Sequence, residues 1–374
     1  MDQTVTDYNA TRFSEDRGTL CHAPSVNLNF EQTGNATACC YNRRFILGRY
    51  PAQTVSEIWE GARIHQMREL LAKGDLSQGC QLCMQQLQAR NYSGLRARPF
   101  DGMNRNPKAK HSDGPVPRMM EFELSNVCNL ECVMCNGYFS SSIRKNRERL
   151  EPQKNVYDEA FVEQLVPYLP YLLQTKFLGG EPFLNPIYYK IWEKIVEVNP
   201  SIDACITTNA TIMNKKVKDL IFKLKPSFII SCDSLDKKTY ESIRVNASFD
   251  AFIENLGVFM KASSYAGKFM AFSVCPMVNN WKTLPQILQF ANENTICLGI
   301  NTVVWPPQLS IKNLEPGEIL KIIVYLESQF APDLARHSNW WVRNNFHTYQ
   351  DMLKQFRYWA AEKVGRPAEA VTHA

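Results

Sequence analysis

Residues 128–135 read Cys128-Asn129-Leu130-Glu131-Cys132-Val133-Met134-Cys135, which places three cysteines in a C-x3-C-x2-C spacing. The stretch follows Met120-Glu121-Phe122-Glu123-Leu124, whose alternating apolar residues predict a strand that ends at this loop. Three thiolates from one loop suit three irons of a cubic iron–sulfur cluster, because soft thiolates favour that metal. Structural zinc is the alternative, but such sites use four ligands, usually as two close pairs. A triplet predicts one open iron, where a small molecule can bind.

The triplet, the strand before it and Gly179-Gly180-Glu181-Pro182 resemble the radical S-adenosylmethionine (radical SAM) enzymes. The resemblance covers roughly residues 118–308. It implies that Cys128, Cys132 and Cys135 hold a 4Fe–4S cluster whose open iron chelates the amino and carboxylate groups of SAM. It also implies reductive cleavage of SAM to methionine and a 5′-deoxyadenosyl radical, which abstracts hydrogen from a substrate carbon.

The same resemblance implies a set of SAM-binding residues at the ends of later strands. Thr207-Thr208-Asn209-Ala210-Thr211 is similar to the family's Thr-Asn-Gly stretch, with Ala210 where glycine is usual, and Ser231-Cys232-Asp233-Ser234 is similar to its Ser-Ile-Asp-Gly. The implied roles are the SAM amino group for Gly179, Gly180 and Glu181, the ribose for Ser231 and Asp233, the SAM carboxylate for Arg244, and the adenine side for Met134, with Asn209 in the same site.

Five further cysteines fall in residues 1–90, at positions 21, 39, 40, 80 and 83. Gln32-Thr33-Gly34-Asn35 predicts a hairpin turn between residues 25–30 and 36–39, and residues 55–71 predict amphipathic helix. Hairpin, helices and a closing C-x-x-C resemble the twitch module, a shortened form of the SPASM auxiliary-cluster domain. The resemblance implies a second, fully ligated 4Fe–4S cluster on Cys21, Cys39, Cys80 and Cys83.

Two points about this module stay open from the sequence. Cys40 is the spare by the family spacing, although it could exchange with its neighbour Cys39. A four-cysteine structural zinc site is the alternative to a cluster. The module also departs from the family in its position, because it precedes the barrel and does not follow it.

From residue 118 onward, alternating strand and helix patterns predict parallel β/α units. The expected strands lie near 120–126, 175–179, 202–207, 227–232, 269–276 and 299–304, and the expected helices near 138–149, 187–198, 213–223, 250–264 and 281–294. We expect an α/β fold with a partial (β/α)6 barrel over 118–308. The hairpin-and-helix module is expected over 1–90, with a loose start over 1–20, and a basic linker or flap over 91–117. A helical cap is expected over 309–374, and its last ten residues are expected to fray.

The 374-residue chain carries 42 lysines and arginines against 37 acidic residues, a net charge of +5. That excess is too small to indicate nucleic acid binding, so the aromatic and basic residues at 340–359 are read as a cap on the barrel. No apolar signal segment or run near ~18 apolar residues occurs. Twelve cysteines without an export signal favour metal binding over disulfides. We therefore expect a cytoplasmic protein with no membrane or nucleic acid partner.

Four cysteines remain, at positions 205, 232, 275 and 297. Buried free cysteine usually acts as a small apolar side chain. Cys232 and Cys275 differ, because both fall at the expected carboxyl ends of strands, where a thiol could return a hydrogen atom to a substrate radical.

The expected reaction is a two-electron oxidation of a sugar-like or other small biosynthetic intermediate, with the auxiliary cluster as electron acceptor and a flavodoxin- or ferredoxin-type reductant. A small molecule is favoured because no segment ahead of Cys21 is long enough to grip a leader peptide. The alternatives are redox-neutral epimerisation with a cysteine donor, modification of a peptide, and sulfur insertion from the auxiliary cluster. An alternative from another functional class is an RNA-binding protein whose fold is stabilised by bound metal.

Overall fold

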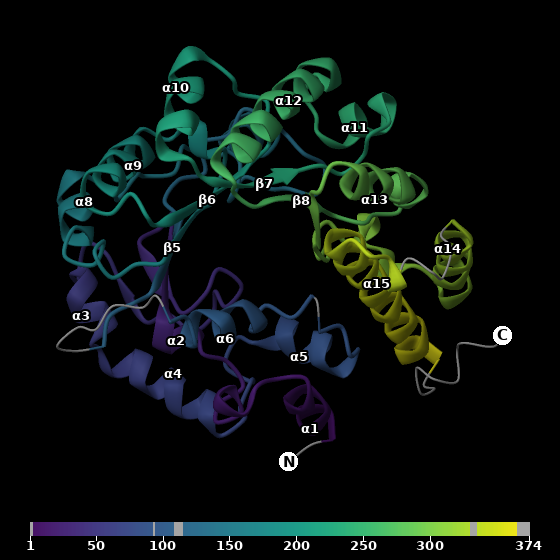
Figure 1. The fold of residues 1–374 in the computed structure, drawn as a ribbon, viewed down its shortest axis with the longest axis horizontal. Helices are drawn as coiled ribbons and strands as arrows, with labels where there is room; N and C mark the ends of the chain where they lie inside the picture. Colours follow the sequence, from purple (N-terminus) through teal and green to yellow (C-terminus); the bar gives the residue numbers. More distant parts are fainter. Residues whose placement is uncertain (1–2, 93, 108–114, 330–334, 365–374) are drawn as a thin grey trace.

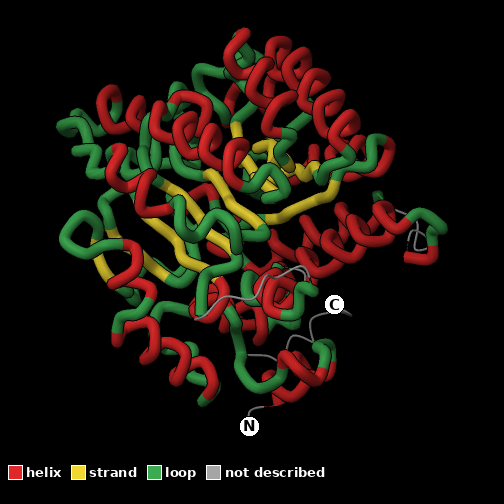
Figure 2. Tube along the Cα trace, turned by 60° about the vertical axis from the view of Figure 1, so that its left-hand side comes forward, coloured by secondary structure: helices red, strands yellow, loops and turns green. Residues whose placement is uncertain are grey.

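One nine-stranded sheet runs through the computed structural model, which describes residues 3–92, 94–107, 115–329 and 335–364. The strand order is β3-β2-β1-β4-β5-β6-β7-β8-β9, with β3 and β9 at the two edges. Figure 2 shows the strands following one another as a curved band with helices along its outer side.

The second half of the sheet is the expected set of parallel β/α units. Each of its strands pairs in parallel with the next along the chain. These strands are β4 (Met119–Glu123), β5 (Gln174–Phe177), β6 (Asp203–Thr208), β7 (Ser227–Ser231), β8 (Met270–Val274) and β9 (Cys297–Ile300). The six strands predicted from the sequence are therefore confirmed, with β9 beginning two residues earlier than expected.

Helices follow the strands and cover the outer face of the sheet, as Figure 1 shows for α8 to α13. They are α7 (Ser141–Asn146), α8 (Glu159–Leu165), α9 (Pro186–Val198), α10 (Lys215–Leu224), α11 (Lys237–Ile243), α12 (Phe249–Ala266) and α13 (Leu284–Glu293). Helix α7 is shorter than the expected helix over 138–149. Helices α8 and α11 were not predicted.

The N-terminal module is a three-stranded unit with short helices, and its first strand joins the barrel sheet. Its elements are α1 (Gln3–Ala10), α2 (Ala23–Val26), β1 (Asn27–Glu31), β2 (Asn35–Thr37), β3 (Gly48–Arg49), α3 (Val55–Trp59), α4 (Ala62–Ala72), α5 (Gln81–Gln88) and α6 (Arg98–Asn104). The expected hairpin is β1 and β2, which pair antiparallel. On its other side β1 pairs in parallel with β4, from Asn27 opposite Met119 to Glu31 opposite Glu123.

Strands β1 and β4 are buried on both faces, and the two faces differ in chemistry. On the outer face, Phe30 and Phe122 stack on each other and meet Phe161 of α8 edge-on. Alternate residues of a strand point to opposite faces. The polar residues of the two strands therefore point to the inner, concave side, where Asn27 and Glu121 are in contact.

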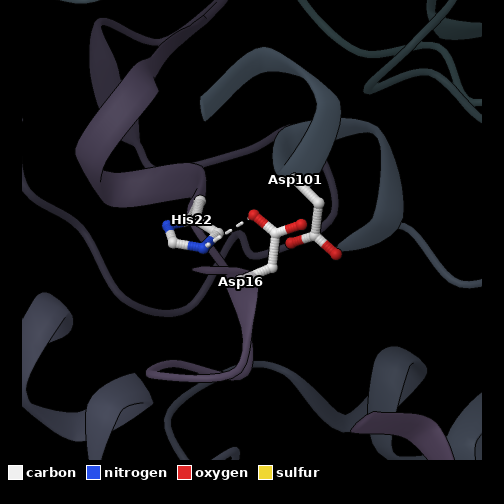
Figure 3. A group of neighbouring side chains, drawn as sticks. All are labelled: Asp16, His22 and Asp101. Carbon is white, nitrogen blue, oxygen red and sulfur yellow. Dashed lines mark ion pairs between the residues drawn. The ribbon is translucent and has the colours of Figure 1, made fainter. Parts of the chain in front are cut away.

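The first 20 residues are not loose where they are described, because a buried ion-pair network holds them. Arg12 donates to both oxygens of Asp101 on α6, at 2.8 and 2.7 Å, and Arg105 donates to Asp16 at 2.6 Å. Figure 3 shows His22 pointing at Asp16, with Asp101 beside it. The two carboxylates lie close enough to His22 to suggest a cation site. Since two guanidinium groups already neutralise these carboxylates, the ion pairs hold together segments that are distant in the chain.

The segment expected as a basic linker packs as part of the module. It contains α6, whose Phe100 belongs to the main core. Arg96 reaches across to the end of β9, donating to the Ile300 carbonyl at 3.1 Å and to the Asn301 side chain. Its guanidinium also lies over the Tyr41 ring. The N-terminal module thus contacts both β4 and the segment after β9, across the concave side. Lys108 and Lys110 of this segment lie outside the described residues.

The C-terminal cap consists of α14 (Pro316–Ser328) and α15 (Trp340–Val364), which pack on each other, and α15 also packs on α13 and β9. Asn345 of α15 anchors the cap by accepting from the Leu298 backbone N–H at 2.8 Å. Residues 365–374, expected to fray, lie outside the described residues. Within the described chain, no helix is both long and apolar enough to cross a membrane.

Candidate functional site

The three cysteines of the central loop line a cavity of about 300 Å³ at the carboxyl ends of β4 to β7. The cavity is also lined by most of the other residues predicted to hold SAM: Met134, Gly179, Gly180, Asn209, Ser231 and Arg244. Burial raises the pKa of Cys128 to about 11 and that of Cys135 to about 12. These thiols are therefore neutral at pH 7 until iron displaces their protons.

The cysteine loop is held in place from three sides. The Cys128 carbonyl accepts from Ser142 at 2.7 Å, at the start of α7. The Val133 N–H donates to the Ile243 carbonyl at 2.9 Å, and the Glu181 N–H donates to the Val127 carbonyl at 2.8 Å. Gly180 has a φ of +53°, and a Cβ there would lie 2.2 Å from the Val127 carbonyl oxygen. Glycine is therefore required where the loop after β5 meets the cysteine loop.

The Glu181 side chain is fully buried and joins the ends of β5 and β6. Its oxygens accept from Thr208 Oγ1 and from the Asn209 N–H, both at 2.8 Å. Burial raises its pKa to about 7. The sequence-based role was a direct contact with the SAM ammonium, but the side chain is not among the residues lining the cavity. Glu181 instead positions Asn209, while the backbone of Gly179 and Gly180 borders the cavity.

This raised pKa predicts a pH-dependent stability. The folded protein binds the Glu181 proton more tightly than the unfolded chain, so the stabilisation is present below about pH 4.5 and is lost as pH rises through about 7. A shift of this size corresponds to up to about 3 kcal/mol. We expect Glu181→Gln to gain stability relative to the SAM-free wild type between pH 5.5 and 8.5 in anaerobic thermal unfolding. A difference that is constant across this range would contradict the assignment.

Ala210 occupies a left-handed backbone position directly after Asn209, with a φ of +58°. Such a conformation costs an L-residue roughly 1–2 kcal/mol, and glycine adopts it freely. The family resemblance implies glycine at this position, and the backbone conformation supplies the physical reason.

We expect Ala210→Gly to leave stability unchanged or to raise it by up to about 1 kcal/mol, because relief of strain competes with the added freedom of the unfolded chain. Ala251→Gly, near the start of α12, is the matched control and should lower stability by about 1 kcal/mol. Anaerobic thermal unfolding of the two variants measures the difference. Equal destabilisation by both substitutions would show that residue 210 is not strained.

Arg244 and Asp233 form a buried pair below the cavity, with Nη2 and Oδ2 2.6 Å apart. The other Asp233 oxygen accepts from the Cys275 N–H at 2.8 Å. Asp233 is fully buried with both oxygens engaged, so it positions Arg244 and does not reach the ribose as expected. Arg244 Nη1 lies 3.8 Å from Cys132 Sγ, and the guanidinium borders the cavity. The cation is thus placed where a ligand carboxylate beside the cysteine loop could meet it.

The two candidate hydrogen donors occupy different environments. Cys232 is fully buried in the main core, and its thiol faces the Ser234 carbonyl. We therefore no longer consider Cys232 a hydrogen-atom donor. Its neighbour Ser231 on β7 lines the cavity, and adjacent residues of a strand face opposite sides of the sheet. Cys275 is partly exposed and packs, as Met134 of the cysteine loop does, against the small core of Ile243, Met277 and Val303. Cys275 remains a candidate.

The four cysteines assigned to the second cluster line one shared, mostly apolar cavity in the N-terminal module. They are Cys21, Cys39, Cys80 and Cys83. Cys40 turns away from them: its N–H donates to Glu121 at 3.1 Å, and its thiol lies 3.8 Å from the same carboxylate. This geometry supports the ligand choice made from spacing.

The spacing of the sulfurs tests zinc against a cluster. Tetrahedral zinc with Zn–S bonds of ~2.3 Å requires sulfurs about 3.8 Å apart. Within the described residues, which include all twelve cysteines, no three cysteine sulfurs lie mutually within 4.8 Å. Neither cysteine set therefore has the close spacing of tetrahedral zinc, and by their chemistry the thiols that line each cavity fit an iron–sulfur cluster.

Sequence reasoning missed a set of charged residues between the two cysteine sets. Arg43 of the module pairs with both oxygens of Glu123, at 2.6 and 2.8 Å, and lies 3.4 Å from Glu31. Lys176 on β5 pairs with Glu121 at 3.3 Å. The sequence does show glutamates at alternate positions of β4, which indicates one polar face of that strand. Only the pairing of β1 with β4 shows that this face is turned towards the N-terminal module.

Comparison with known families agrees with this geometry. Residues 122–291 match the family described as Radical SAM superfamily, and residues 21–84 match SPASM, an iron-sulfur cluster-binding domain. The chain carries a radical SAM domain, preceded by a SPASM domain. It therefore binds SAM and a 4Fe–4S cluster through the radical SAM domain, and auxiliary iron–sulfur through the SPASM domain.

Curated relatives match this chain over part of its length. The uncharacterized protein MJ0907 of Methanocaldococcus jannaschii is 32% identical over 120 residues, 30% of this chain and 38% of that protein. GTP 3′,8-cyclase of Chlorobaculum tepidum is 23% identical over 46% of this chain and 49% of its own. The subtilosin biosynthesis protein AlbA of Bacillus subtilis is 29% identical over 35% of this chain and 27% of its own. The matches thus span less than half of each relative.

Solved structures also match part of the chain. Streptococcus suis SuiB bound to S-adenosylmethionine has a TM-score of 0.42 and 19% identity, covering 59% of this chain and 48% of SuiB. The enzyme anSMEcpe with bound AdoMet has a TM-score of 0.44 and 16% identity, covering 58% of this chain and 62% of its own.

Proposed function

We propose that this radical SAM enzyme oxidises a carbon that bears a hydroxyl or amino group in a sugar-like small molecule. One observation carries the proposal: the two cysteine sets lie at opposite ends of the same strands. The triplet follows the carboxyl end of β4, whereas Cys39 adjoins Ala38, whose carbonyl accepts from Asn27 at the start of β1. Since β1 and β4 run parallel, a substrate beside them lies between a radical source and an electron acceptor.

The residues divide the work between the two ends. Cys128, Cys132 and Cys135 would hold the cluster that binds SAM, beside the cavity, and Cys21, Cys39, Cys80 and Cys83 would hold the auxiliary cluster. The backbone of Gly179 and Gly180 and the guanidinium of Arg244 would contact the SAM amino and carboxylate groups, with Asp233 fixing Arg244. When bound, these groups supply a reducing electron, a hydrogen-abstracting 5′-deoxyadenosyl radical and an acceptor for one electron.

The redox balance favours one SAM for each product. Cleavage of SAM takes up one electron and gives methionine. The substrate C–H bond loses its hydrogen atom to the deoxyadenosyl group, and the substrate then loses one proton and one electron to form C=O or C=N. The electron consumed at SAM therefore equals the electron released by the substrate. A flavodoxin- or ferredoxin-type protein is the proposed source of the first electron, and the reducing cytoplasm is the proposed setting.

Cys275 supports a second candidate, epimerisation. Its thiol lies in the group that includes Met134 beside the cysteine loop, so it could return a hydrogen atom to a substrate radical. The product would then carry a hydrogen that exchanges with solvent. A peptide substrate is a further alternative, since one solved structure is described as SuiB bound to its precursor peptide SuiA.

The test uses the anaerobically reconstituted protein with SAM, dithionite and carbon-deuterated probes, namely glucosamine, glucose and a serine-containing tripeptide. The proposal expects deuterium in 5′-deoxyadenosine from a carbohydrate probe, one SAM consumed per oxidised product, and no solvent deuterium in the product when D2O is used. Solvent deuterium at the reacting carbon that disappears in Cys275→Ala would establish the epimerase. Deuterium transfer from the tripeptide alone would overturn the small-molecule assignment.

A further inference from the structure

One positively charged side chain lines the cavity of the four auxiliary cysteines. The cavity is bordered mainly by apolar residues, among them Leu71, Leu87 and Phe100. Of the described residues that line it, Arg96 alone is an arginine, lysine, aspartate or glutamate. Because apolar surroundings screen a charge weakly, this cation acts strongly on any charge that the cavity holds.

The partners of Arg96 leave its charge uncompensated. Nη2 donates to the Ile300 carbonyl at 3.1 Å and to the side-chain oxygen of Asn301, both just after or at the end of β9. The guanidinium carbon lies 4.6 Å from the centre of the Tyr41 ring. These partners are neutral, and no carboxylate in the described parts of the chain forms an ion pair with Arg96. The full positive charge is thus retained.

Cys83, one of the four auxiliary cysteines, already responds to this cation. Burial raises the pKa of the Cys83 thiol. The backbone N–H and the guanidinium of Arg96 oppose that rise, as does the backbone N–H of Ala97, because all three favour the thiolate. Arg96 therefore stabilises negative charge on a sulfur of the auxiliary set.

The other end of the Arg96 side chain is connected to the barrel. Asn301, which accepts from Arg96, donates to Ser273 of β8 at 2.7 Å. Ser273 lies opposite Ser231 of β7, and Ser231 lines the cavity beside the cysteine triplet. Arg96 thus lies between the two cysteine sets, on the side of the auxiliary cavity that faces the barrel.

We propose that Arg96 raises the reduction potential of the auxiliary cluster and so makes it an electron acceptor. Reduction adds one negative charge to a cluster, and the potential of a cluster depends on net charge and on hydrogen bonds to its sulfurs. A nearby cation stabilises the reduced form. In the oxidation proposed above, the substrate radical loses a proton to solvent and one electron to this cluster. The inference rests on that function and assigns a residue to its last step, in which Arg96 acts through the cluster and does not touch the substrate.

An anaerobic redox titration of the reconstituted full-length protein, followed by EPR, tests this role without turnover. The signal that changes when SAM is added belongs to the triplet cluster, so the other signal reports the auxiliary cluster. Arg96→Gln keeps a hydrogen-bond donor and removes the charge. At the wild-type midpoint potential, its auxiliary cluster should show a reduced-to-oxidised ratio that is lower by about threefold or more. Arg96→Lys, which keeps the charge, should restore most of the ratio.

Two further variants separate charge from packing. Asn301→Asp retains Arg96 and its hydrogen bond but places a carboxylate beside the guanidinium, so it should lower the ratio in the same direction. This variant also decides the question if Arg96→Gln fails to retain its auxiliary iron. Arg98→Gln is the matched control: Arg98 lies two residues away, donates to Thr11 and does not line the cavity, so its removal should leave the ratio unchanged.

A wild-type ratio in Asn301→Asp, or in an Arg96→Gln protein that retains about eight irons, would overturn the inference and leave Arg96 as a clamp between the module and the barrel. An equal shift of the triplet cluster would also overturn it, because the effect would then not be local. The expected shift in a protein that cleaves SAM but oxidises none of the carbohydrate probes would contradict the proposed function alone.

Discussion

Cys132→Ala is expected to lower the iron content from about eight to about four atoms per chain and to reduce 5′-deoxyadenosine to the level of a protein-free control. Cys132 is the middle ligand of the proposed triplet, and its sulfur lies 3.8 Å from Arg244, beside the cavity. Two remaining thiolates leave a second iron without a protein ligand, so the cluster is lost. Iron analysis and chromatography after reaction with SAM and dithionite provide both readouts.

Cys297→Ala is the control for that variant. Cys297 is buried on β9, where its sulfur faces Asn344 of the C-terminal cap, so its loss removes a small apolar contact and no ligand. It should retain about eight irons and cleave SAM. If Cys132→Ala also retained eight irons, the triplet would not be the site of a cluster.

The second large effect separates two neighbouring cysteines. Cys39→Ala should reduce the iron content to about four per chain and abolish the oxidised product, while cleavage of SAM continues. Cys40→Ala should keep about eight irons, because the Cys40 thiol faces Glu121 and not the other module cysteines. The pair is matched in residue type and differs by one position in the chain.

The opposite pattern would reassign the ligand to Cys40. Zinc that survives in the wild-type module, with only about four irons per chain, would make the module a structural staple and remove the electron acceptor from the proposed reaction. Iron, zinc and sulfide analysis of the same preparations distinguishes these results.

Local patterns in the sequence were sufficient for the barrel and for the loops at its carboxyl edge. Five of the six barrel strands end in, or are followed within two residues by, glycine, threonine, asparagine or serine, so strand positions and loop chemistry could be read together. The cysteine triplet and Gly179-Gly180 were found in this way, and the structure brings them to one cavity. These features depend on residues close together in the chain.

The position of β1 could not be read from the sequence, because it depends on pairing between segments about 90 residues apart. Taken alone, Asn27 and Asn29 look like the polar face of a surface hairpin. Only beside β4 do they become buried and turn towards Glu121. The same limitation explains the N-terminal segment, where Arg12 looks solvated until Asp101 is placed next to it.

The side chains of Glu181 and Asp233 illustrate a second limit. The family resemblance implied a ligand contact for each of them. Both side chains are fully buried, and their oxygens accept hydrogen bonds from protein donors. Glu181 holds Asn209, and Asp233 holds Arg244. A motif identifies which residues belong to a site, whereas hydrogen-bond partners decide which of them reach the ligand.

The central claim is that this chain is a two-cluster radical enzyme, and one measurement addresses it directly. The wild-type protein is reconstituted anaerobically with iron and sulfide, its iron is counted and its EPR recorded, and SAM and dithionite are then added. We expect about eight irons per chain, an EPR signal that changes on SAM binding, and 5′-deoxyadenosine formed together with methionine. Full iron loading without any 5′-deoxyadenosine would contradict the account.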